Sequence, residues 1–134
     1  MRTKLRGFVT CLVLFSATLP LAAHHSFAVD YDVKKPVKLQ GVVTMIQWTN
    51  PHAHVYLDVV ENGAKNNWNF EMASPNILER NGWSRKALNV NDQVTVEGYS
   101  GRVVTTRGFL TSITLSDGRK LFASPGPGTD APYQ

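Results

Sequence analysis

The sequence predicts a mainly β protein: a small five-stranded barrel resembling the OB-fold, with one short helix between its third and fourth strands. Two observations lead to this prediction. Five segments are rich in β-branched and apolar residues, and a helix-forming segment separates the third of them from the fourth. Three strands, a helix and two more strands are the element order of the OB-fold, a Greek-key barrel. The alternative is another small β-sandwich, because element order alone does not fix the topology.

The first three strands are predicted from their residue patterns. The first covers residues 37–48, and Gly41 inside it indicates a bulge or a bend. In the second, residues 53–60, apolar residues occupy every other position, so one face of the strand is expected in the core. A turn at Asn62-Gly63 then joins it to residues 67–72, and the two strands should form a hairpin.

The helix and the last two strands follow from capping residues and from renewed alternation. Ser74 is a typical N-cap and Pro75 suits the first helical position. Asn81-Gly82 then ends the helix. The fourth strand is predicted at residues 92–99 and the fifth at residues 108–115.

The first 23 residues have the composition of a secretory signal peptide. Three basic residues precede an apolar run at residues 8–19, and the small-residue sequence Leu21-Ala22-Ala23 follows it. The apolar run is shorter than the roughly 20 residues that cross a bilayer. We therefore expect a periplasmic or secreted protein, cleaved after Ala22 or Ala23, without a stable membrane span in its mature chain.

Cleavage after residue 23 divides the remaining chain into three parts: an N-terminal arm at 24–36, the barrel domain at 37–123 and a disordered tail at 124–134. The tail contains too few apolar residues to pack. The only cysteine, Cys11, is removed with the signal peptide, so neither a disulfide nor a thiolate is expected.

The signal peptide also accounts for most of the positive charge. It holds three of the 14 basic residues and none of the ten acidic ones, so its removal lowers the net charge from +4 to +1. Nucleic-acid binding normally depends on a strongly positive surface. No nucleic-acid partner is therefore expected.

All four histidines survive cleavage, in two clusters: His24 and His25 at the new N-terminus, and His52 and His54 at the entrance of the second strand. An N-terminal histidine can chelate a metal ion with its α-amine and ring Nδ1. A third nitrogen, from His52 or His54, would complete a T-shaped set suited to copper. Cleavage after Ala22 would instead make His25 the third residue, which forms a square-planar site with the terminal amine and two amide nitrogens.

Four segments cover nearly all of the chain after residue 23: HHSFAVDYD, LQGVVTMIQWTNPHAHVYLDV, SPNILERNGWSRKALNVNDQVTVEGY and LSDGRKLFA. Together they resemble DUF6152, a family of small exported bacterial proteins of unknown function. The His-His-Ser-Phe start and the Trp-Thr-Asn-Pro-His segment are fairly specific, and His52 matches the Asn-Pro-His element. The resemblance implies export and a single β-rich domain, and it implies no activity.

These patterns favour a binding protein over an enzyme. We expect a periplasmic protein that holds a copper-type ion through the N-terminal histidine pair and His52, with His54 as an auxiliary ligand. The alternative is a metal-free module in which a barrel face around Trp48, Asn50 and Tyr56 binds an envelope protein or a small ligand. A third alternative is an oxidative copper enzyme with a histidine brace, for which the sequence indicates no substrate surface.

Overall fold

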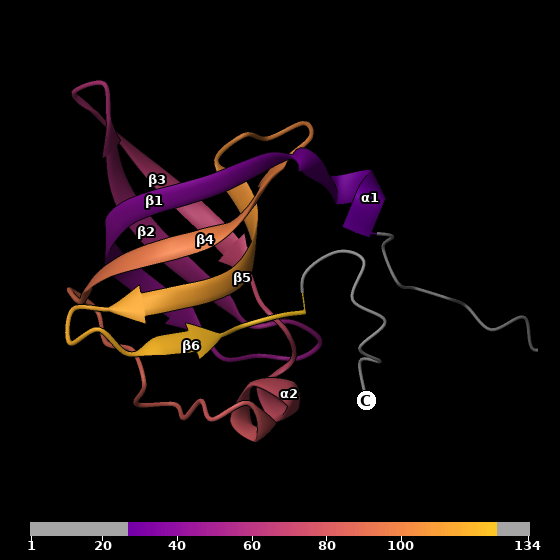
Figure 1. The fold of residues 1–134 in the computed structure, drawn as a ribbon, viewed down its shortest axis with the longest axis vertical. Helices are drawn as coiled ribbons and strands as arrows, with labels where there is room; N and C mark the ends of the chain where they lie inside the picture. Colours follow the sequence, from indigo (N-terminus) through magenta and orange to yellow (C-terminus); the bar gives the residue numbers. More distant parts are fainter. Residues whose placement is uncertain (1–26, 126–134) are drawn as a thin grey trace, which may run out of the picture.

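The computed structural model describes residues 27–125, and these residues form six strands and two short helices (Figure 1). In chain order they are α1 (Phe27–Asp30), β1 (Tyr31–Gln47), β2 (His54–Glu61), β3 (Ala64–Glu71), α2 (Pro75–Arg80), β4 (Gln93–Gly101), β5 (Arg107–Leu115) and β6 (Lys120–Phe122). Figure 1 shows β2 and β3 behind β1, β4, β5 and β6, with α2 below the strands.

The first five strands are bonded as a ring. β1 pairs with β2 and with β4, β2 pairs with β3, and β4 pairs with β5, in each case antiparallel. The ring closes between β3 and β5, where residues 69–71 pair in parallel with residues 107–109. This connectivity, with α2 between β3 and β4, is that of the OB-fold. The prediction of a mainly β, OB-like barrel is confirmed.

Some element boundaries differ from those expected. β1 begins at Tyr31 rather than at residue 37, because Tyr31 is buried and pairs with Gly101 of β4. The second half of the predicted arm is therefore strand, and α1 precedes it. β6 is an additional strand against β5. Of the predicted tail, Ser124 is buried, and residues 126–134 lie outside the described residues.

The barrel core contains the apolar residues that alternation placed inward. Val55 and Leu57 of β2 are fully buried, while His54 and Tyr56, which alternate with them, are half-buried on the opposite face. Met72 is also fully buried, as its strand spacing predicts, and is a core residue. Burying one such side chain contributes about 1.5 to 3 kcal/mol relative to leaving it in water.

Phe109 is placed differently from the prediction. Its spacing predicts a shared inward face with Ile113 and Leu115, but a register shift in the β4–β5 pairing lets Leu110 enter the core. The ring of Phe109 packs instead on that of Phe27, with the ring centroids 4.8 Å apart. A bulge changes which residues of a strand face the core. Phe109 therefore anchors the N-terminal segment.

The closure between β3 and β5 requires a glycine. A Cβ atom on Gly108 would lie 2.4 Å from Cε1 of Phe70, whose side chain is fully buried. Carbon atoms in contact normally stand about 3.5 to 4.0 Å apart. Only a residue without a side chain lets β5 approach β3 over this ring.

We expect Gly108→Ala to destabilise the fold by about 1 to 3 kcal/mol, because the added methyl group must displace the Phe70 ring. Urea unfolding followed by tryptophan fluorescence measures this change. Ser116→Ala, in the exposed turn after β5, is the matched control and should leave the midpoint nearly unchanged. Equal midpoints for the two variants would contradict the proposed close contact.

Glu97 on the outer face of β4 supports a pH prediction. Its carboxylate accepts hydrogen bonds from the ammonium group of Lys120 and the hydroxyl of Ser112, and it forms an ion pair with Lys38. Lys120, Lys38 and Ser112 together lower the pKa of Glu97 to about 2. The folded pKa is below the unfolded value of about 4.3, so this stabilisation is present above that pH and is lost as the pH falls toward 2.

Glu97→Gln should therefore lower the Tm at neutral pH by a small amount, since the network is largely exposed to solvent. The Tm difference between the variant and the wild type should shrink as the pH falls from about 5 to about 2. Thermal melts monitored by circular dichroism across this range measure the difference. A Tm difference that stays constant with pH would rule out this role of the carboxylate.

Candidate functional site

The candidate site lies where β2 begins and β3 ends, beside the closure of the barrel. His52 precedes β2, His54 opens it, and Glu71 ends β3 directly opposite His54. Alternate residues of a strand share a face. Asn69 and Glu71 therefore project outward while Phe70 between them fills the core. We call His52, His54, Asn69 and Glu71 the histidine–glutamate site.

His52 is oriented through its Nδ1 atom. Nδ1 lies 3.2 Å from the backbone carbonyl oxygen of Met72 and 3.4 Å from Oε1 of Glu71. A carbonyl oxygen can only accept, so Nδ1 of the neutral ring carries the proton and Nε2 carries the lone pair. The His52 side chain is 43% exposed, which leaves the ring accessible from solvent.

His54 is oriented in the same way by an amide. Its Nδ1 lies 2.9 Å from Oδ1 of Asn69. The amide nitrogen of Asn69 donates to the hydroxyl of Tyr56, 3.4 Å away, and this hydroxyl donates to Gln47. This chain of donors leaves Oδ1 as the acceptor, so Nδ1 of His54 also carries the proton. Both histidines therefore hold an unprotonated Nε2.

Glu71 connects this site to two other parts of the chain. The hydroxyl of Tyr31, at the start of β1, donates to Oε2 of Glu71 at 2.6 Å, and a guanidinium nitrogen of Arg107 lies 4.0 Å from the same oxygen. Burial and the neighbouring Glu71 raise the pKa of Tyr31 well above its usual value, so its hydroxyl remains the donor. The other carboxylate oxygen faces His52.

The N-terminal segment is held at this same end of the barrel. The ring of Phe27 lies on that of Phe109, which pairs with Glu71 across the β3–β5 closure. Arg102, in the loop after β4, donates from Nε to the carbonyl oxygen of Ala28 at 2.7 Å. Aromatic packing and hydrogen bonds together bring the first described residues close to the histidine–glutamate site.

The predicted site residues fall in two groups. His52 and His54 both contact residues at the end of β3, in the histidine–glutamate site, whereas His24 and His25 lie outside the described residues. Within residues 27–125, no three side chains of histidine, cysteine, aspartate or glutamate gather closely enough to hold a metal ion. Sequence reasoning missed the roles of Glu71 and Asn69, although both occupy outward positions of a predicted strand.

The face predicted around Trp48, Asn50 and Tyr56 is only partly open. The ring of Trp48 is half-buried, 6.4 Å from the ring of Trp83, and the guanidinium of Arg85 lies over it at 6.0 Å. Tyr56 is hydrogen-bonded within its own face. Asn50 is exposed and precedes a cis bond to Pro51.

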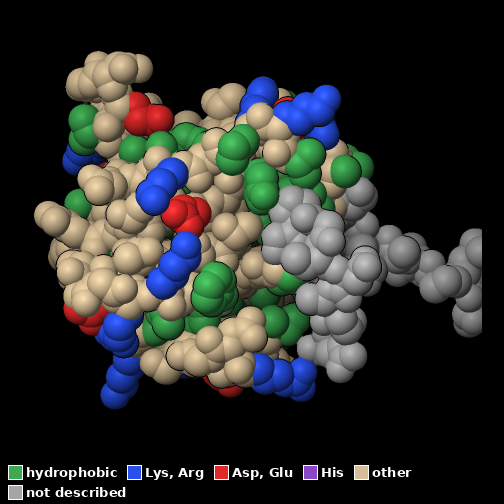
Figure 2. All heavy atoms as spheres, in the orientation of Figure 1, with side chains coloured by type: hydrophobic (Ala, Val, Ile, Leu, Met, Phe, Trp, Pro, Cys, Tyr) green, Lys and Arg blue, Asp and Glu red, His purple; other side chains and the backbone are tan. Residues whose placement is uncertain are grey.

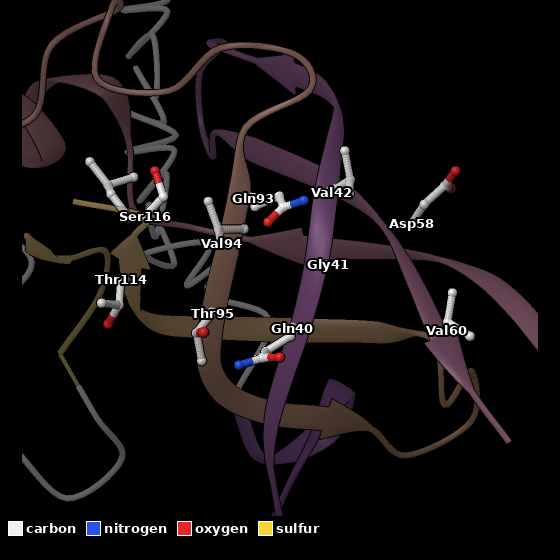
Figure 3. Close-up of a pocket in the computed structure, with 11 residues that line it drawn as sticks. Gln40, Gly41, Val42, Asp58, Val60, Gln93, Val94, Thr95, Thr114 and Ser116 are labelled. Atoms are coloured by element: carbon white, nitrogen blue, oxygen red, sulfur yellow. The ribbon is translucent and has the colours of Figure 1, made fainter. Parts of the chain in front are cut away.

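A separate groove of about 490 Å³ crosses the outer face of β1 and β4 (Figure 3). Its lining is mainly uncharged and includes Gln40, Val42, Gln93, Thr95, Thr114 and Ser116. Asp58 at its border is paired with Lys65, 3.2 Å away. The groove offers hydrogen-bonding side chains but no histidine, and we therefore place the candidate site at the histidines.

These features define a small OB-like barrel with a histidine–glutamate site beside its closing strands. The chain belongs to DUF6152, a family of unknown function, whose model matches residues 12–110. No curated protein and no solved structure gives a significant match. None of the helices within residues 27–125 has the length and apolar character to cross a membrane.

Tyr31→Phe tests the hydrogen bond that ties the N-terminal segment to Glu71. A hydrogen bond to a charged group contributes about 1.5 to 3 kcal/mol, and we expect the free energy of unfolding to fall by about that amount. Urea unfolding measures it. Tyr99→Phe is the matched control, because Tyr99 packs in the same aromatic cluster and its hydroxyl has no partner among the described residues. Equal losses in both variants would contradict the role of Tyr31.

Proposed function

We propose that the protein is an exported periplasmic copper-binding protein and not an enzyme. The ion is held by the α-amine and imidazole groups of the processed N-terminus, at His24 and His25, together with Nε2 of His52. His54 is an auxiliary ligand. The observation that carries this proposal is the orientation of His52, whose Nδ1 faces two acceptors and whose Nε2 is left with its lone pair.

This orientation is typical of metal-binding histidines. Such histidines donate their second ring nitrogen to a carbonyl or carboxylate group, which fixes the tautomer and makes the ligating nitrogen more basic. The Nδ1 atom of His52 has both kinds of acceptor, in Met72 and Glu71. His54 has an amide acceptor in Asn69. The site therefore supplies up to two prepared nitrogen ligands.

The position of the N-terminal segment supports a shared site. Phe27 packs on Phe109, the residue paired with Glu71, and Tyr31 donates to Glu71 itself. His25 precedes Phe27 by two residues, so the two Cα atoms can be at most roughly 7 Å apart. A terminus tethered this closely can reach His52 with little loss of chain entropy.

The donor set favours copper. An α-amine and two or three imidazoles are nitrogen ligands of intermediate softness, which suit Cu(II), and divalent copper binds such sets more tightly than its first-row neighbours do. The terminal amine is available only after the signal peptide has been removed. Processing during export would therefore create the complete site, so that copper binds only to exported protein.

The processed protein loaded with one equivalent of Cu(II) should give an electron paramagnetic resonance spectrum with nitrogen hyperfine splitting. Its affinity for Cu(II) should exceed that of a protein carrying an additional N-terminal methionine, because the extension displaces the chelating amine. A competition titration against a chelator of known affinity compares the two. Equal affinities would remove the amine from the site, and a spectrum without nitrogen splitting would contradict the proposal as a whole.

Glu71→Gln replaces the carboxylate beside Nδ1 of His52 with an uncharged amide of about the same size. Loss of such a partner typically lowers metal affinity about 10- to 100-fold, and we expect a loss in this range in the same titration. Glu79→Gln, on the exposed side of α2, is the matched control and should bind Cu(II) as tightly as the wild type. Unchanged affinity in Glu71→Gln would show that His52 is not a ligand oriented by this residue.

A further inference from the structure

Four exposed valines gather at the end of the barrel where the N-terminal segment meets the loop between β4 and β5. Their exposed fractions are 66% for Val29, 45% for Val33, 91% for Val103 and 54% for Val104. Figure 2 shows hydrophobic side chains next to lysine and arginine side chains at this end of the molecule. We call these four residues the valine end.

Backbone contacts bring the four valines together. Tyr31 pairs with Gly101, and the amide of Arg102 donates to the carbonyl oxygen of Asp30 at 2.9 Å. These bonds place the segment holding Val29 and Val33 beside the loop that begins at residue 102. A register shift between residues 31 and 36 moves the intervening residues out of the ladder. The valine end is thus a surface built from two segments about 70 residues apart in sequence.

Core packing does not explain these side chains. Single exposed apolar residues are common on protein surfaces, but a contiguous exposed group usually marks an interaction surface. Val103 and Val104 are adjacent in a loop, where a polar residue would serve the fold equally well. Their exposure therefore points to a contact outside the barrel.

The charges around the valine end are mainly positive. Lys34, Lys35, Arg102 and Arg107 lie in the same two segments, and within the described chain the ammonium groups of Lys34 and Lys35 form no ion pair. The acidic residues there are Asp30 and Asp32, and Asp32 accepts a hydrogen bond from the backbone amide of Lys34. Arg107 is paired with Glu71 of the histidine–glutamate site, so three other cationic side chains, those of Lys34, Lys35 and Arg102, stand beside the two carboxylates.

We propose that the valine end docks on the surface of a membrane that contains anionic phospholipid. Apolar side chains framed by lysine and arginine fit the boundary of a bilayer, where the apolar groups enter the acyl region and the cations face lipid phosphates. A purely polyanionic partner would leave the valines without a role. Docking of this kind positions the histidine–glutamate site near the membrane, because Tyr31 contacts both regions. It does not depend on metal binding.

Val103→Trp provides a reporter at the most exposed valine of this surface. Its emission should shift to shorter wavelength when the processed protein meets vesicles of phosphatidylglycerol and phosphatidylcholine, and should not shift with phosphatidylcholine alone. Val90→Trp is the matched control, because Val90 is 53% exposed in the loop before β4. A shift at position 103 alone supports the proposal. No shift at position 103, or equal shifts at both positions, overturns it. If the valine end binds an acidic protein instead of a membrane, the emission at position 103 will not shift with vesicles.

Vesicle sedimentation tests the two components of the surface. Each lysine near an anionic membrane strengthens binding roughly fivefold, so Lys34→Gln with Lys35→Gln should weaken it by more than about tenfold. Val103→Ser with Val104→Ser should weaken it to a similar degree. The control pairs should bind as the wild type does: Lys65→Gln with Lys86→Gln, and Val60→Ser with Val90→Ser. Binding that survives both test pairs overturns the proposal.

Discussion

The parallel pairing of residues 69–71 with residues 107–109 closes the barrel, and it is the shortest ladder in the ring. Phe70 points inward there and packs against Gly108. Because neighbouring strand residues point to opposite faces, Asn69 and Glu71 must then point outward, where they meet the two histidines. The same three residues therefore complete the core and form the outer site, and a loss of closure would separate Glu71 from Arg107 and from the N-terminal segment.

The contacts between β2 and β3 at the histidine–glutamate site could have been predicted from the sequence. A tight turn at Asn62-Gly63 fixes the register of the hairpin, and counting back from it pairs His54 with Glu71 and Tyr56 with Asn69. Sequence reasoning considered mainly the apolar positions of β3, and it therefore left these polar partners out. Strand order, helix position and the inward residues of β2 were predictable because alternation and capping are local signals.

The contacts that Glu71 and β3 make with β1 and β5 had no local signal in the sequence. The hydroxyl of Tyr31 reaches Glu71 across 40 positions of sequence, and a parallel pairing of β3 with β5 leaves no turn between them from which a register could be counted. The facing of Phe109 depends on an extra residue in β5, Thr111, which has no partner in the pairing with β4 and which residue spacing does not reveal. Contacts of this kind are set by the closed barrel as a whole, and the structure is needed to find them.

One end of the barrel thus combines three features: the oriented histidines, the attached N-terminal segment and the valine end. Tyr31 connects them, since its hydroxyl reaches Glu71 and its backbone pairs next to the loop that carries two of the exposed valines. Displacement of the N-terminal segment would change both the histidine–glutamate site and the valine end. A membrane contact and a metal ion bound by the terminus would then favour the same docked position of the segment, and each would strengthen the other.

The protonation of the histidine rings tests the central claim most directly, because it depends on the contacts of Glu71, Met72 and Asn69 and requires no metal. Long-range proton–nitrogen correlation spectra of the metal-free protein, recorded at alkaline pH, distinguish the two neutral tautomers. We expect Nδ1 to carry the proton in His52 and His54, with Nε2 unprotonated. Spectra in which His52 is protonated at Nε2 would contradict an imidazole held ready for a ligand at the closing strands.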